Sequence, residues 1–301
     1  MAAVIEVDDL TKRYGTSRGI EGLTFQVEQG EVFGFLGPNG AGKTTTIRTL
    51  LDLLRPSSGT ARLFGEDSIT SAVDIRRRIG YLPGEFTLFP KLTGREALQY
   101  SANMRGGVAW DEVESLAQRF DCDLDRPICK LSQGNKKKVG LIAAFMHRPE
   151  LVILDEPTNG LDPLAQQEFM NLVRETAARG ATVFLSSHVM PEVERTCDRV
   201  AIIRAGRLVA VEQVAALKTR ATRRVDIHYA QPPPPGKPEV PGVAEVARVD
   251  ALVSYDVRGA AGPLIEAAVQ LGGILDINTH EPSLEDIFLS YYDHDASEVG
   301  A

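Results

Sequence analysis

Hydrophobic and polar positions along the chain follow two periods, and together they predict an α/β fold. Short runs of β-branched and aromatic residues bounded by Gly or Pro are typical of strands. Such runs occupy residues 4–10, 23–27, 31–37, 61–65 and 78–83. The apolar runs at 151–157 and 181–188 do not alternate with polar residues, which indicates strands of a sheet covered on both faces.

The spacing of apolar residues between these strands predicts helices. Residues 42–54 place Ile47, Leu50, Leu51 and Leu54 on one stripe, the period of a helix that packs against a core. A second helical region covers residues 93–120. Short strands therefore alternate with longer helices along the chain.

The pattern changes near residues 231–242, where QPPPPGKPEVPG contains too much proline for a helix or a central strand. We interpret this stretch as a stiff loop or linker. Around it, the sequence predicts strands at 223–230, 251–257 and 274–280 and a helix at 262–273. These elements indicate a small α+β appendage.

The length of 301 residues is sufficient for two domains. We expect a main domain over residues 1–220, with a helical subdomain at about 85–150, and an accessory domain over 221–301. The formal net charge of −8 argues against a protein that mainly binds nucleic acid by electrostatics. Three cysteines without a CxxC pair suit a reducing cytosol. Because the sequence has no signal peptide and no apolar stretch of about 18–20 residues, we expect that the chain does not itself span a membrane.

The strongest chemical motif is GPNGAGKTT at residues 37–45, which fits the pattern G-x-x-x-x-G-K-[ST] between a strand and a helix. Its glycines permit turns that point several backbone N–H groups into one concavity, and the helix N-terminus adds about half a positive charge. Lys43 can reach the terminal phosphates of a nucleotide, and the Thr44 hydroxyl can ligate magnesium. We therefore predict a nucleoside triphosphate site formed by Gly37, Pro38, Asn39, Gly40, Ala41, Gly42, Lys43, Thr44 and Thr45.

A second motif, LVILDEP at residues 151–157, places two acids at the end of an apolar strand. Asp155 is positioned to face the magnesium ion, and Glu156 can polarise an attacking water as a general base. Two acids at a strand end are often solvated, but that interpretation is weak beside a phosphate loop. The next apolar strand ends at His188, which can contact the γ-phosphate.

The stretch KLSQGNKKKVGL at residues 130–141 contains three consecutive lysines behind Ser132 and Gly134. A run of like charge is usually a solvated face of a helix. A patch for nucleic acid, or a helix whose N-terminus faces an anion, would use the same residues. The lysines alone do not decide between these interpretations.

The order of the motifs resembles the nucleotide-binding subunit of an ATP-binding cassette (ABC) transporter over about residues 4–220. The order is the phosphate loop, LSQGN, LVILDEP, NGLD at 159–162 and then His188. The resemblance implies a P-loop NTPase of ABC type in the α/β class, with a mixed β-sheet core, a helical subdomain and an antiparallel β-subdomain. The small α+β appendage would follow this cassette.

The resemblance also implies further site residues. Tyr14 in KRYG looks like the aromatic residue that stacks on adenine, and Asp162 looks like part of the loop that faces a dimer partner. LSQGN looks like the signature at a helix N-terminus, where the Ser132 hydroxyl and the close backbone approach at Gly134 would meet the γ-phosphate held by the other subunit. On this interpretation Lys136, Lys137 and Lys138 form a solvated or partner-facing surface rather than a nucleic-acid site.

By the same resemblance, ATP with magnesium brings two cassettes together and hydrolysis separates them. The second cassette is a copy of this chain or a homologous one. The work passes to an integral membrane permease, which places the chain at the cytoplasmic face of the cell membrane. The segment EPSLEDIFLSYY at residues 281–292 resembles the tail of exporter ATPases that serve drugs, antibiotics and lipids. A soluble ABC ATPase that acts on the ribosome or on DNA stays open as the alternative, although the double cassette and the coiled-coil insertion typical of those classes are not visible.

The sequence departs from the family pattern at several positions. Gln133 and Asn135 replace the commonest Gly and Gln of the signature. Gly84 stands where the strand usually runs into a glutamine that ligates magnesium, so the metal needs another ligand there, most simply water. The neighbouring Glu85 can hold that water, or it can face solvent or a partner, and the sequence does not decide between these.

Overall fold

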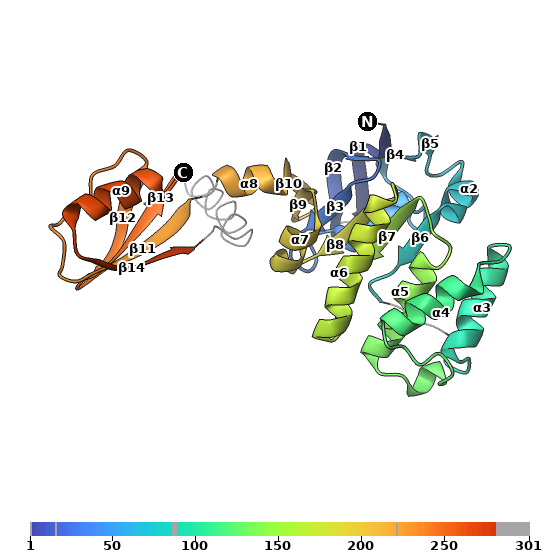
Figure 1. Cartoon of the computed structure of the whole chain (residues 1–301). Coiled ribbons are helices and arrows are strands. Elements are labelled where there is room, and N and C mark those ends of the chain that lie inside the picture. The colour runs from blue at the N-terminus through green and yellow to red at the C-terminus, as the bar shows by residue number, and fades with distance from the viewer. Residues whose placement is uncertain (1, 16, 86–88, 221, 237, 281–301) are drawn as a thin grey trace. The chain divides into compact units, whose positions relative to one another are not determined.

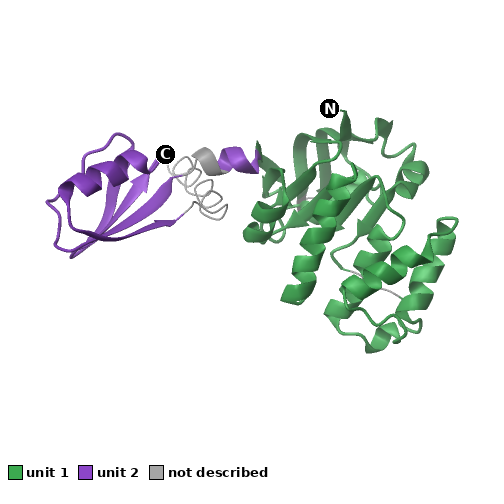
Figure 2. Ribbon diagram, viewed as in Figure 1, with its two compact units in different colours: residues 1–212 green, residues 213–301 purple. Residues whose placement is uncertain are grey.

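The computed structural model describes residues 2–15, 17–85, 89–220, 222–236 and 238–280. The chain divides into two compact units (Figure 2). Unit 1 comprises Met1–Glu212 and unit 2 comprises Gln213–Ala301. Each unit has a hydrophobic core of its own. Within the described ranges, no helix is both long enough and apolar enough to cross a membrane.

Unit 1 contains a six-stranded sheet in the order β10-β9-β3-β8-β7-β6 (Figure 1). Its strands are β3 (Val32–Leu36), β6 (Ile79–Leu82), β7 (Leu151–Asp155), β8 (Thr182–Ser187), β9 (Arg199–Arg204) and β10 (Arg207–Gln213). Strands β6, β7, β8, β3 and β9 run parallel. Every residue of β3, β7 and β8 is buried, which confirms for β7 and β8 the prediction of strands covered on both faces. The carboxyl ends of these neighbouring strands meet at one edge of the sheet, where α/β proteins usually bind ligands.

A second, antiparallel sheet in the order β2-β1-β4-β5 shares the core of unit 1. Its strands are β1 (Ala3–Tyr14), β2 (Ser17–Glu28), β4 (Ser58–Leu63) and β5 (Glu66–Asp67). Phe25 of β2 packs against Phe33 and Phe184 of the six-stranded sheet, with ring centroids 5.9 and 6.4 Å apart. These aromatic contacts join the two sheets, because each ring buries a large apolar area. The fold class expected from the resemblance, with its antiparallel β-subdomain, is therefore confirmed.

Helices connect the strands of unit 1. They are α1 (Lys43–Leu50), α2 (Ala72–Arg77), α3 (Gly94–Met104), α4 (Trp110–Arg119), the short 3-10 helix η1 (Ile128–Lys130), α5 (Gln133–Phe145), α6 (Pro163–Ala178) and α7 (Met190–Thr196). Helices α3, α4 and α5 gather on one side of unit 1 (Figure 1). Helix α1 ends at Leu50, whereas the apolar stripe predicted a helix as far as Leu54. The chain turns there because Asp52 adopts a positive φ of 52°, and Leu54 is left half-buried.

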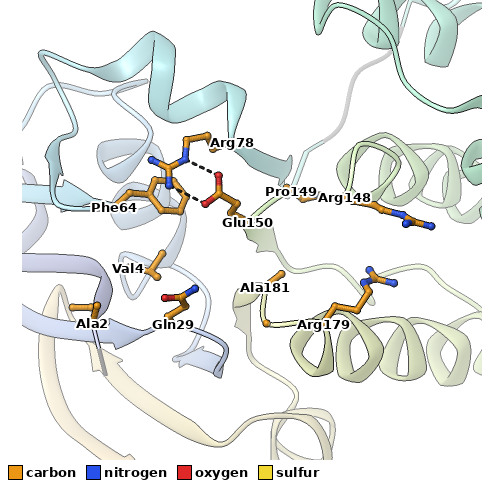
Figure 3. A pocket seen from close by; sticks show the side chains of 12 residues that line it. Ala2, Val4, Gln29, Phe64, Arg78, Arg148, Pro149, Glu150, Arg179 and Ala181 are labelled. Carbon is orange, nitrogen blue, oxygen red and sulfur yellow. Dashed lines mark hydrogen bonds and ion pairs between the residues drawn. The ribbon is translucent and has the colours of Figure 1, made fainter.

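At the amino ends of the parallel strands, a hollow of about 460 Å³ opens at the surface of unit 1 (Figure 3). Arg78 lies on its rim and donates hydrogen bonds of 2.8 and 2.9 Å to the two carboxylate oxygens of Glu150. The guanidinium of Arg78 also lies 3.7 Å from the centre of the Phe64 ring. Arg78 therefore links the segment after β4 to the start of β7.

Unit 2 contains α8 (Val214–Arg220) and an antiparallel sheet in the order β12-β13-β11-β14. Its strands are β11 (Arg223–Tyr229), β12 (Val243–Val249), β13 (Leu252–Val257) and β14 (Ile274–His280), and α9 spans Gly262–Leu271. In β11 and β13, buried and more exposed residues alternate, so one sheet face forms a core with Leu264 and Ala268 of α9.

Most elements predicted for the C-terminal part are confirmed to within about two residues, but β12 was not predicted. No residue of β12 is fully buried, and its sequence shows no clear alternation of apolar and polar residues. The described residues of the proline-rich stretch 231–242 contain no helix or strand. The segment at 281–292, whose sequence resembles the tail of exporter ATPases, lies outside the described residues.

Candidate active site

The phosphate-loop motif connects β3 to α1, as the pattern predicted. Gly42, immediately before α1, has a positive φ of 112°, and a Cβ there would lie 2.7 Å from Ile20 Cγ2. A Cβ on Gly37 would collide with the carbonyl of Ile203. The backbone N–H of Ala41 donates to the carbonyl of Pro38 at 3.1 Å, which closes the loop on itself. The phosphate loop can therefore adopt this conformation only with glycine at positions 37 and 42, where a side chain would collide with Ile203 or Ile20.

Lys43 begins α1 and is almost completely buried, with 5% of its surface exposed. Its ammonium donates hydrogen bonds to the carbonyls of Gly37 at 2.6 Å and Pro38 at 3.2 Å. The same Nζ lies 3.0 Å from Glu156 Oε1. A buried ammonium requires such partners because the interior cannot solvate it. The three contacts hold the lysine inside the loop, where its charge faces any anion that the loop binds.

Asp155, the last residue of β7, is fully buried. Thr44 Oγ1 donates to Asp155 Oδ2 at 2.7 Å, and Ser186 Oγ donates to Asp155 Oδ1 at 2.6 Å. A hydroxyl and a carboxylate oxygen beside a phosphate loop are the hard oxygen ligands that Mg²⁺ prefers. Among the described residues no group of three or more His, Cys, Asp or Glu forms a metal cage. One or two protein oxygens are the usual protein share when phosphates hold Mg²⁺, so Thr44 and Asp155 fit this ion.

Glu156 follows β7 and lies between two cationic or polar partners. Its Oε2 is 2.8 Å from Nδ1 of His188, and its Oε1 faces Lys43. The residue adopts a positive φ of 49°, which is uncommon without glycine. Its backbone N–H donates to both the carbonyl and the hydroxyl of Ser186, at 3.2 and 3.1 Å. These bonds fix the strained turn and aim the carboxylate at the phosphate loop rather than at solvent.

Tyr14 and Thr45 lie together at the edge of this site. The Tyr14 hydroxyl and Thr45 Oγ1 are 3.4 Å apart, and 44% of the Tyr14 surface is exposed. The ring is therefore accessible for stacking on a base, and its role in adenine binding stays a prediction. Asn39 and Gly40 are exposed at the tip of the loop, where Gly40 has a positive φ of 79°.

The signature residues occupy the start of α5. Ser132 is exposed and caps the helix, because its hydroxyl accepts a bond from the Asn135 N–H at 3.2 Å. A Cβ on Gly134 would lie 2.5 Å from the Gly160 carbonyl, so this glycine is required by packing within the chain. The sequence had predicted a close approach at Gly134 only toward the other subunit. Asp162 caps α6 through the Ala165 N–H at 2.9 Å. That bond and, second, the ammonium of Lys138 lower the pKa of the Asp162 carboxyl.

The prediction that all three lysines of α5 form a solvated or partner-facing surface was wrong for two of them. Lys137 and Lys138 are buried, with 6% and 7% of their surfaces exposed, whereas Lys136 is half-buried. Lys138 Nζ forms an ion pair with Asp162 Oδ2 at 3.1 Å. The reason is tertiary: α5 packs against β6, α3 and α4, so two successive lysines point inward.

The structure brings Lys43, Thr44, Asp155, Glu156 and His188 into one cluster at the carboxyl ends of β3, β7 and β8. Ser186 also belongs to this cluster, although the sequence analysis did not identify it. A polar residue that directly follows an apolar run within a fully buried strand was the signal that pointed to it. Ser132 and Asp162 lie in separate segments joined by the contacts of α5 with the 160–162 loop.

Comparison with known proteins gives a consistent result. The model of the family described as "ABC transporter" matches residues 20–159. The bacitracin transport ATP-binding protein BcrA of Bacillus licheniformis is 36% identical over 96% of this chain and 97% of its own length. The daunorubicin resistance ATP-binding protein DrrA3 of Streptomyces coeruleorubidus is 32% identical over 95% of this chain and 94% of its own length. A solved structure of the ATP-binding subunit of an ABC transporter is 34% identical and superposes with a TM-score of 0.66 over 71% of this chain and 92% of that one.

Proposed function

Because the chain belongs to the ATP-binding cassette transporter family, we propose that it is the ATP-hydrolysing subunit of an exporter. Its cargo is a hydrophobic or amphipathic compound such as a drug, an antibiotic or a lipid, which crosses the membrane through a separate permease. The names of two relatives, for bacitracin transport and daunorubicin resistance, support this class of cargo. They favour transport over action on the ribosome or DNA, and they support a position at the cytoplasmic face of the cell membrane.

The observation that carries the proposal is the convergence of Lys43, Thr44, Asp155, Glu156 and His188. The phosphate-loop N–H groups and Lys43 bind the phosphates of ATP. Thr44 and Asp155 hold magnesium, which neutralises charge on the phosphate oxygens. Tyr14 stacks on the adenine. These residues bind and orient the nucleotide. Hydrolysis then requires a base that accepts a proton from the attacking water and holds the water in line with the γ-phosphate.

Glu156 is the base in this proposal. Its Oε1 is paired with Lys43 at 3.0 Å, and a terminal phosphate oxygen competes for the same ammonium. Phosphate binding therefore frees one carboxylate oxygen to accept a proton from water. His188 holds the other oxygen at 2.8 Å and keeps the carboxylate oriented toward the phosphate loop.

A second cassette completes the site in the proposed cycle. Ser132 is exposed at the N-terminus of α5, where the helix dipole favours an anion. We assign it to the γ-phosphate held by a second copy of this chain or a homologous cassette. Asp162 lies near the same surface through its pair with Lys138. ATP then draws two cassettes together and hydrolysis releases them, which moves the permease.

Glu156→Gln tests the proposal. We expect ATP turnover by the purified chain or its membrane complex to fall by about 10²–10⁴-fold, the usual contribution of general base catalysis, with ATP affinity retained. Because bound ATP persists in this variant, light scattering should detect a dimer that requires ATP.

Glu192→Gln is the matched control. This half-buried carboxylate accepts a 2.6 Å hydrogen bond from Thr158 close to Glu156, and burial raises its pKa. It is the nearby acid that would replace Glu156 as base if the assignment were wrong. We expect its turnover to stay within about threefold of the wild type. If Glu192→Gln abolished turnover and Glu156→Gln left it nearly unchanged, Glu156 would not be the base. A wild type that does not hydrolyse ATP would reject the proposed function.

A further inference from the structure

The backbone at position 84 lies directly against the carboxylate that we assign to magnesium. Gly84 follows β6, and a Cβ built there would be 3.1 Å from Asp155 Oδ2 and 3.3 Å from its Cγ. Such contacts are tighter than ordinary van der Waals contact, so a side chain at this position would press on Asp155. With glycine, the peptide of residue 84 approaches Asp155 without a side chain between them.

Lys137 reaches this peptide from α5. Its Nζ donates to the Gly84 carbonyl at 3.4 Å, while only 6% of the residue is exposed. Burial lowers the pKa of Lys137, and the attraction of Asp155 and Glu156 opposes that effect. The ammonium therefore lies within electrostatic range of both carboxylates of the candidate site.

The adjacent Lys138 shows what a purely structural lysine on this helix does. Lys138 has a carboxylate partner, Asp162, at 3.1 Å. Lys137 instead has a carbonyl partner at a long distance, although an ammonium can donate three hydrogen bonds. Burying a charge with so weak a direct partner is costly unless the charge serves the neighbouring carboxylates. The bond to the Gly84 carbonyl and the attraction of Asp155 and Glu156 therefore place the Lys137 ammonium beside the candidate site.

We propose that Lys137 is a positioning residue for ATP hydrolysis, which holds the Gly84 carbonyl beside Asp155 and supplies a positive charge next to Asp155 and Glu156. The inference rests on the proposed function. Lys137 lies on the helix that starts at Ser132, so it connects the signature surface to the magnesium side of the same chain.

The experiment compares three substitutions at one position in the full chain. Lys137→Met removes the donor and the charge, Lys137→Gln keeps a donor without charge, and Lys137→Arg keeps both. We expect kcat to fall about tenfold in Lys137→Met, the usual effect of losing a hydrogen bond to a charged group, with an intermediate loss in Lys137→Gln and the smallest in Lys137→Arg. ATP affinity, measured by fluorescence without turnover, should change by less than about twofold.

The magnesium dependence gives a readout that a merely structural role would not produce. Removing a cation near Asp155 lessens the repulsion of Mg²⁺, so the magnesium midpoint of Lys137→Met should fall by about threefold while kcat also falls. General loosening of the site would raise that midpoint instead. Lys136→Met, the half-buried neighbour, is the matched control and should leave both quantities unchanged.

Three results would overturn the proposal: a kcat for Lys137→Met within about threefold of the wild type, losses that do not follow the order Met, Gln, Arg, or a magnesium midpoint that rises in Lys137→Met. If Lys137→Met fails to fold, the comparison of Gln with Arg decides, because they differ in the charge. A wild type that hydrolyses ATP, together with an inactive Glu156→Gln, preserves the proposed function whatever Lys137 does. The two proposals therefore fail separately.

Discussion

Charged side chains gather at both ends of the parallel strands in unit 1, but the two ends use them differently. At the amino ends, Arg78 pairs with Glu150 and Arg199 pairs with Glu31, with N–O distances of 2.8 and 3.0 Å. Each pair ties two segments together. The Glu150 side chain is 61% exposed, so water screens its attraction to Arg78, whereas the Glu31 side chain is only 11% exposed. These pairs join neighbouring strands at their amino ends.

At the carboxyl ends, the charged groups are buried and converge. Lys43 is 5% exposed and Asp155 is fully buried, and both lie beside the phosphate loop. Thr44 and Ser186 each donate to one oxygen of Asp155. The comparison teaches that charge does not by itself identify a site. Convergence of charged and polar groups from several strand ends does, because each group then interacts with the same bound phosphate, and the low dielectric of a buried site strengthens those interactions.

Strand β8 carries hydroxyl side chains at both ends, Thr182 at the amino end and Ser186 and Ser187 at the carboxyl end, which allows the comparison to be tested within a single strand. Ser186→Ala, at the carboxyl end, removes a 2.6 Å bond to Asp155 Oδ1 and a bond to the strained Glu156 N–H. We expect ATP turnover to fall about 10–100-fold, because bonds to charged groups are the stronger ones. Steady-state kinetics with saturating ATP and magnesium measure this. Unchanged turnover would mean that Asp155 is oriented without Ser186.

Thr182→Val is the counterpart at the amino end of β8. Thr182 Oγ1 accepts from the Gly30 N–H at 3.0 Å and donates to the Glu28 carbonyl at 3.5 Å. The substitution keeps the shape and leaves the Gly30 N–H unpaired, so we expect unit 1 to lose about 1–2 kcal/mol of unfolding free energy. ATP turnover should stay within about twofold of the wild type. Urea denaturation measures the loss of stability, and kinetics on the same preparation measure turnover. If Thr182→Val lost as much turnover as Ser186→Ala, the two ends of the strand would not differ in function.

Much of this arrangement could be predicted from the sequence because its determinants are local. The apolar runs fixed β3, β7 and β8, and residues at the ends of parallel neighbouring strands must meet at one edge. The positions of Asp155 and His188 relative to the phosphate loop follow from that rule. The ABC-type fold class was also predicted correctly, but from the resemblance of the ordered motifs to a known family rather than from these local patterns.

Other features depend on contacts between distant segments and could not be predicted. A lysine run has the same sequence on a solvated helix as on α5, and only the packing of α5 against β6 shows that Lys137 and Lys138 are buried. The need for glycine at position 134 arises from Gly160, which lies in another loop. Strand β12 has no fully buried residue, so no alternation was present to detect.

The smallest expected effect concerns the Arg78–Glu150 pair at the amino ends. Hydrogen bonding to Arg78, more than its charge, lowers the pKa of Glu150. A carboxyl with a lowered pKa in the folded state stabilises the fold above its unfolded pKa, and that contribution disappears as the pH falls through the folded pKa. Glu150→Gln should therefore cost unit 1 about 0.5–1 kcal/mol of unfolding free energy near neutral pH, the upper range for an exposed pair.

The difference between wild type and Glu150→Gln should shrink as the pH falls below the ordinary glutamate pKa of about 4.3 and vanish below the lowered pKa of Glu150 in the folded state. Arg78→Lys is the matched variant, because it keeps the charge but cannot make both parallel bonds of 2.8 and 2.9 Å. It should lose part of the stability and retain ATP turnover. Urea denaturation across this pH range measures the difference. A gap that persists in acid would assign the effect to the packing of Arg78 on Phe64 rather than to the charge pair, and a loss of turnover would show that the amino ends also serve the active site.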